Sequence, residues 1–85
     1  MIIVYPSALK HGLTEEEVIS AWEHVFEYKM REGDHFPPHY LGLGVLPDGR
    51  VVELVALSDG YDWYIFHAMC PPTRGFMHEY KGGSR

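Results

Sequence analysis

The pattern of apolar and polar residues predicts a helix early in the chain. Thr14 followed by Glu17 fits a capping box, in which a hydroxyl and a carboxylate satisfy the free N–H groups at the start of a helix. Apolar residues then recur at three- and four-residue spacing, which predicts one long helix over residues 14–31 that is stopped by Gly33. The buried face of this helix is expected to hold Val18, Ala21, Trp22, Val25 and Phe26.

Short apolar runs predict strands on both sides of that helix. Residues 2–5 predict an edge strand, and residues 7–11 predict one helical turn ended by Gly12. Pro-Asp-Gly and Ser-Asp-Gly turns separate three further strands, which are expected over residues 40–46, 50–57 and 61–69. A short closing helix is expected over residues 73–80.

These elements define an α+β fold class. The expected architecture is an N-terminal strand, a short helix and one long helix packed on an antiparallel β-meander, with a short C-terminal helix. A chain of 85 residues has room for one modest core, so a single domain is expected over residues 1–85, with a frayed tail over residues 81–85.

Composition narrows the class of protein. An apolar content of 46%, with two Trp, six Tyr and four Phe, is too high for a disordered chain. No apolar run approaches the roughly 18 residues of a membrane span, and the first residues lack the basic start of a signal peptide. The single Cys70 excludes an internal disulfide and cysteine-cluster zinc sites. A soluble cytoplasmic protein without a built-in cofactor, and with no membrane partner, is therefore expected.

The charge is acidic overall but uneven along the chain. The net charge of −5 disfavours broad electrostatic capture of nucleic acid, which depends on clustered Lys and Arg. Residues 1–34 carry seven acidic side chains against three basic ones, whereas residues 35–85 carry five against four, together with four of the six histidines. An anion-binding face is therefore expected in the second half.

Residues 7–16 and 65–69 contain short motifs that resemble those of microbial ribonuclease toxins. The expected order of elements is similar to that of the RelE superfamily, and residues 7–16 resemble the Lys-His-Gly-Val/Ile-Ser/Thr segment of its BrnT-type members. Residues 65–69 match a branch whose last strand ends in His-Ala-Met. BrnT-type sequences usually end this strand in Ser-Ala-Arg, so that His67 and Met69 stand here where those sequences carry Ser and Arg.

The resemblance implies a catalytic set on the last strands and the terminal helix. RNA cleavage without a metal needs an acid, a base and a cation for the developing phosphorane charge. His67 is expected as acid or base, Arg74 as the phosphate-binding cation, and Glu53 as a base or as the group that orients His67. The alternatives are a structural histidine, an arginine that ties down the chain end, and a glutamate on the solvent face of its strand.

Further residues are expected to bind RNA. Lys10 and His11 can bind phosphate, although both also suit the end of a short helix, where cations complement the dipole. Arg50 and Trp63 are expected at the same RNA surface, with Trp63 either stacking on a base or packing in the core. His35 and His39 lack a third ligand at diagnostic spacing, so no metal site is expected.

Two functions follow from these features. The first is the toxin of a type II toxin–antitoxin system, an endoribonuclease that cleaves mRNA, in some cases on the ribosome, inhibits translation and is neutralised by a cognate antitoxin protein. The second is a non-catalytic interaction or regulatory module of the same fold. The motifs and the size of the chain favour the first, whereas the acidic charge and the missing strand-end arginine favour the second.

Overall fold

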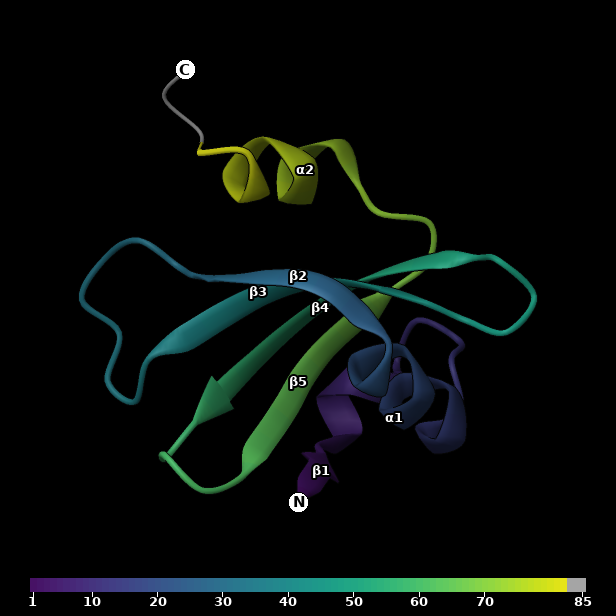
Figure 1. Cartoon of the computed structure of the whole chain (residues 1–85), viewed down its shortest axis with the longest axis horizontal. Helices are drawn as coiled ribbons and strands as arrows, with labels where there is room; N and C mark the ends of the chain where they lie inside the picture. Colours follow the sequence, from purple (N-terminus) through teal and green to yellow (C-terminus); the bar gives the residue numbers. More distant parts are fainter. Residues whose placement is uncertain (83–85) are drawn as a thin grey trace.

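The computed structural model describes residues 1–82 (Figure 1). The alternating apolar residues in the second half of the chain form the centre of one five-stranded sheet. Along the chain the elements are β1 Ile2–Val4, the 3-10 helix η1 Pro6–Leu9, α1 Glu15–Glu23, β2 Val25–Met30, β3 His39–Val45, β4 Val51–Ser58, β5 Trp63–Met69 and α2 Arg74–Tyr80. The strand order is β1-β5-β4-β3-β2. The predicted α+β class is therefore confirmed.

The sheet differs from the predicted one in two respects. Its antiparallel meander has four strands, β2 to β5, because β2 joins the three that were predicted. The N-terminal strand β1 lies at the edge beside β5 and runs parallel to it, which makes the sheet mixed. Of the expected terminal tail, residues 83–85 lie outside the described part of the chain.

The start of α1 follows the predicted capping box. The Thr14 hydroxyl accepts a hydrogen bond from the Glu17 N–H at 3.1 Å, and the Glu17 carboxylate accepts one from the Thr14 N–H at 2.9 Å. Both contacts lie within four consecutive residues, so this helix start is set locally.

The predicted helix over residues 14–31 is wrong beyond Glu23. Its second half forms β2, in which Val25 pairs with Gly44 and Tyr28 pairs with Gly42 of β3. A β-branched residue and two aromatic residues suit a strand, and pairing with β3 satisfies backbone groups that β3 would otherwise leave free. The register shifts between Val25 and Glu27, and Phe26, which was expected in the core, is 62% exposed.

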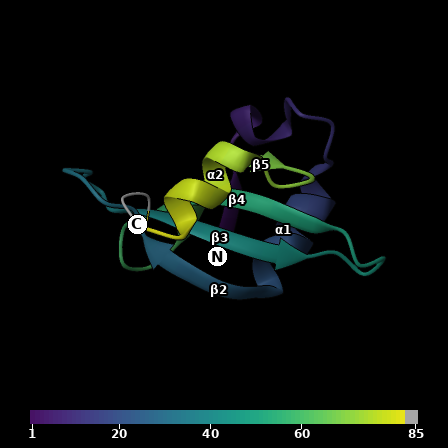
Figure 2. The same ribbon diagram turned by 90° about the horizontal axis from the view of Figure 1, so that it is seen from above.

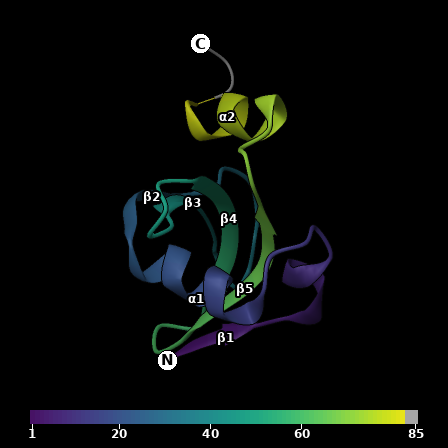
Figure 3. The same cartoon turned by 90° about the vertical axis from the view of Figure 1, so that its right-hand side faces the viewer.

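Two helical layers cover the two faces of the sheet (Figure 3). On one face α1 and η1 bury Ala8, Val18, Ala21 and Trp22, the last only 6% exposed, against the sheet. On the other face α2 lies across the strands (Figure 2), where its Phe76 and Tyr80 pack on β3 and β4. The core is thus divided by the sheet into two clusters.

Two glycines of β3 let α1 lie directly on the sheet. A Cβ atom added to Gly42 would come within 2.9 Å of the Trp22 and Val25 side chains. A Cβ atom added to Gly44 would collide with the backbone carbonyl of Ala21. The Gly42 and Gly44 positions are therefore required by close approach of the helix, not by turn geometry.

No helix among residues 1–82 combines the length and the apolar character needed to cross a membrane.

Candidate active site

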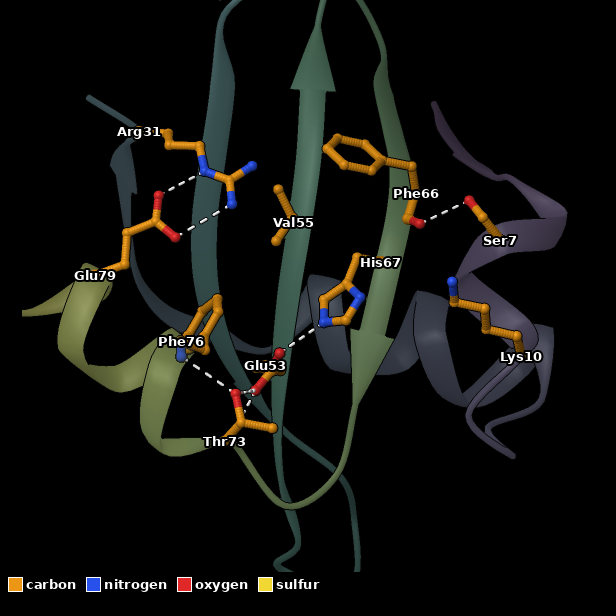
Figure 4. Close-up of a pocket in the computed structure, with 10 residues that line it drawn as sticks. All are labelled: Ser7, Lys10, Arg31, Glu53, Val55, Phe66, His67, Thr73, Phe76 and Glu79. Atoms are coloured by element: carbon orange, nitrogen blue, oxygen red, sulfur yellow. Dashed lines mark hydrogen bonds and ion pairs between the residues drawn. The ribbon is translucent and has the colours of Figure 1, made fainter. Parts of the chain in front are cut away.

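A groove of about 440 Å³ lies on the α2 side of the sheet (Figure 4). Its floor is formed by β4 and β5, one wall by α2 and the opposite wall by the segment around η1. The volume falls within the range of roughly 300–1,000 Å³ typical of small-ligand pockets. The groove contains two of the three predicted catalytic residues, Glu53 and His67.

A β-bulge brings Phe66 onto the groove face beside His67. Val55 of β4 faces His67, but the next residue, Ala56, faces Ile65, so Phe66 has no opposite residue. As a result Phe66 and His67 both line the groove, although they are consecutive in the strand. Bulges of this kind re-aim side chains and are frequent beside active sites.

Glu53 is a buried carboxylate whose two oxygens are occupied by hydrogen bonds. It is only 3% exposed, so the predicted alternative of a solvent-facing glutamate is wrong. Oε1 accepts hydrogen bonds from the Thr73 N–H at 2.6 Å and the Thr73 hydroxyl at 2.9 Å. Oε2 lies 2.6 Å from Nε2 of His67. These partners replace the water that an ionised carboxylate loses on burial.

The contact with Glu53 determines which ring nitrogen of His67 carries the hydrogen. An ionised carboxylate can only accept hydrogen bonds, so Nε2 of His67 must carry the hydrogen in this pair. In the neutral ring Nδ1 is then the nitrogen free to take up a proton, and Figure 4 shows it on the side of Lys10. The pair therefore has the geometry of a base held by an orienting carboxylate.

The wall around η1 brings two of the predicted RNA-binding residues to His67. The Ser7 hydroxyl donates a hydrogen bond to the carbonyl of Phe66 at 2.7 Å, which ties η1 to the bulge. Lys10, just after η1, lines the groove. The ring of His11 meets that of His67 edge-on, with centroids 5.5 Å apart. A cation and a second imidazole thus lie beside the His67–Glu53 pair.

The opposite wall carries an arginine that the sequence did not reveal as a site residue. Arg31 follows β2 and forms a two-point ion pair with Glu79 of α2, with N–O distances of 2.6 and 3.2 Å. These hydrogen bonds raise the pKa of Arg31 and lower the pKa of Glu79 from their usual values. Because residue 31 was assigned to the end of a helix, its place beside the groove could not be foreseen.

Three predicted site residues lie outside this groove. Arg74 is exposed at the start of α2 and does not line the groove. Arg50 is bound to Asp48 and Glu17 on the α1 side. Trp63 packs on Trp22, with ring centroids 4.9 Å apart, and also contacts two tyrosines, Tyr28 and Tyr40. The expectation that these three residues share one surface with His67 is not supported.

The two histidines considered for metal binding stack on each other. The rings of His35 and His39 are 4.3 Å apart and nearly parallel, and His39 also touches Phe66. Within the described residues there is no group of three or more His, Cys, Asp or Glu side chains that could hold a metal ion. Burial, and then the charges of His35 and Arg31, lower the pKa of His39 below its usual value.

We expect His39 to make the stability of the fold sensitive to mild acid. A folded-state pKa below the usual 6.5 means that the unfolded chain binds the proton more readily. The contribution of His39 to stability is therefore present above pH 6.5 and is lost as the pH falls through the folded-state pKa. His39→Phe, which keeps an aromatic ring, should show a smaller fall in melting temperature between pH 7.5 and 5.5 than the wild type. An equal fall in both proteins would contradict this assignment.

Comparison with protein-family models, curated proteins and solved structures found no match to the chain. Functional inference therefore rests on the groove and on the sequence motifs themselves.

Proposed function

We propose that the chain is an endoribonuclease that cleaves RNA by attack of the neighbouring 2′-hydroxyl group. The observation that carries this proposal is the 2.6 Å contact between His67 and the buried Glu53 on the floor of an open groove. A carboxylate and an imidazole in this arrangement suit proton transfer to and from a substrate. Cations on two sides, Lys10 and Arg31, suit a phosphodiester substrate.

Each group has a defined part in the proposed reaction. Nδ1 of His67 takes the proton of the 2′-hydroxyl while the 2′-oxygen forms a bond to phosphorus. The bond between phosphorus and the 5′-oxygen then breaks, and the protonated His11 ring gives its proton to the leaving 5′-oxygen. Lys10 stabilises the extra negative charge of the phosphorane. Glu53 touches no substrate atom and acts as a positioning residue for His67.

The resemblance to BrnT-type toxins supplies the biological setting of this proposal. Lys10 and His11 belong to the Lys-His-Gly motif, and His67 belongs to the His-Ala-Met motif. Both motifs lie at the groove, His67 and Lys10 on its lining and His11 against the His67 ring. We therefore propose a RelE-like toxin that acts on mRNA in the cytoplasm and is held inactive by a cognate antitoxin.

Two features favour the second function, a non-catalytic interaction module. Glu53 also holds the N-terminal cap of α2 through Thr73, which gives the buried carboxylate a structural use. On the edge strand β2, moreover, Phe26, Tyr28 and Met30 are exposed, and such an apolar edge suits a protein partner.

The purified wild-type chain decides between these functions. We expect it to cleave single-stranded RNA in the presence of EDTA and to leave 2′,3′-cyclic phosphate ends. It should not cleave a matched oligonucleotide whose 2′-hydroxyl groups are methylated, because that substrate lacks the nucleophile. Expression without a partner should slow growth. A chain that neither cuts RNA nor slows growth would support the interaction module instead.

A further inference from the structure

The groove offers a second cationic position, on the side facing away from Lys10. In Figure 4 the Arg31 side chain lies at one side of the groove and Lys10 at the other, with His67 between them. The floor between Arg31 and His67 is formed by Val55 and Phe66, which carry no charge. A ligand lying along this floor therefore meets a cation at each end.

We propose that Arg31 binds a phosphate group of the RNA strand next to the phosphate that is attacked. This inference rests on the proposed function, because it takes His67 as the reacting centre. It assigns the role of phosphate-binding arginine to Arg31 instead of the exposed Arg74.

The geometry of the guanidinium supports this role. Nε and Nη2 of Arg31 donate to the two carboxylate oxygens of Glu79. Nη1 takes no part in this ion pair and in Figure 4 points away from Glu79. The backbone N–H of Arg31 donates to the carbonyl of His39 at 2.7 Å, so the residue is fixed at both its main chain and its head group. A planar guanidinium fixed in this way presents its remaining N–H groups in a set direction.

The ion pair with Glu79 leaves Arg31 accessible. The Arg31 side chain is 28% exposed, and that of Glu79 is 39% exposed. A phosphate can therefore approach Nη1 while Glu79 stays bound to Nε and Nη2. Because the Glu79 carboxylate repels the phosphate, removal of its charge should favour binding.

Non-cleavable RNA tests Arg31 separately from catalysis. The ligand is a single-stranded oligonucleotide with 2′-O-methyl groups, and its dissociation constant is measured at two salt concentrations. Arg31→Met should weaken binding about tenfold or more, as expected for the loss of a charge-assisted hydrogen bond to phosphate. It should also lower the slope of log affinity against log salt by about one.

Two further variants separate phosphate binding from other effects of the mutation. Arg74→Met removes the same charge from an exposed site outside the groove and should change affinity by less than about twofold. Glu79→Gln weakens the same ion pair but keeps the cation, and should bind as tightly as the wild type or more tightly. Should Arg31→Met not fold, Arg31→Lys retains the charge and loses the planar head group, and an intermediate loss is expected.

Three outcomes would overturn the inference. The first is an equal loss of RNA affinity in Arg31→Met and Arg74→Met. The second is a loss of RNA affinity in Glu79→Gln as large as that in Arg31→Met. The third is no binding of the oligonucleotide by the wild type. Arg31-dependent binding in a chain that cleaves no RNA would support the phosphate site and would count against the proposed function alone.

Discussion

Gly44→Ala is expected to cost at least about 3 kcal/mol of unfolding free energy, a large part of the 5–15 kcal/mol typical of a natural domain. The added Cβ atom would collide with the Ala21 carbonyl, which belongs to the backbone of α1 and cannot turn aside as a side chain can. The helix would have to lift from β3, which would expose Trp22 and Val18. Urea unfolding followed by circular dichroism measures the loss.

Gly75→Ala is the matched control for this change. Gly75 lies within α2, and no atom would come within 4 Å of its added Cβ atom. Alanine is the better helix former, so a gain of about 0.5–1 kcal/mol is expected there. A lower free energy of unfolding for Gly44→Ala and a higher one for Gly75→Ala would show that the close approach of α1 causes the destabilisation at Gly44. A Gly44→Ala protein as stable as the wild type would mean that α1 does not lie on β3 in this way.

His67→Ala is expected to lower the rate of RNA cleavage by about 10²-fold or more, because the proposed general base is lost. Growth inhibition should fall with it, while the circular dichroism spectrum stays that of the wild type. His78→Ala is the matched control, since His78 is exposed on α2 and does not line the groove. A folded His67→Ala protein that is as toxic as the wild type would exclude this site.

Glu53→Gln tests positioning within the same pair. A glutamine keeps one acceptor oxygen, but its NH₂ group must then face either the N–H of His67 or the donors of Thr73. The hydrogen of the His67 ring is therefore expected to be no longer fixed on Nε2, and the ring is expected to lose its fixed orientation. A change in the pH dependence of the rate, not only in its size, would distinguish this effect from a general loss of structure.

The features that the sequence predicted well are those set by neighbouring residues. Thr14 and Glu17 form their capping box within a single turn, and the Asp-Gly turns at residues 48–49 and 59–60 separate strands that pair with each other. Glu53 was expected as a base or as the group that orients His67, and the two side chains are in contact.

The features that were missed depend on contacts distant in sequence. Val18, Ala21, Trp22 and Val25 fit one helical stripe, and only pairing with β3 shows that Val25 belongs to a strand. The same error hid Arg31, whose partner Glu79 is 48 residues away. Strand alternation cannot reveal a bulge. Arg74 was chosen because it follows β5 closely in sequence, but it is exposed and does not line the groove.

The bulge in β5 also determines which one-residue deletions in a related chain would keep the Glu53–His67 pair. Phe66 is the one residue between Ile65 and His67 that has no opposite residue in β4. A relative lacking this residue would keep His67 opposite Val55, on the face that carries Glu53. In β4, which pairs regularly on its other side with β3, loss of Leu54 would instead turn Glu53 to the opposite face. A one-residue deletion at Phe66 is therefore compatible with an intact Glu53–His67 pair. A one-residue deletion at Leu54 is not.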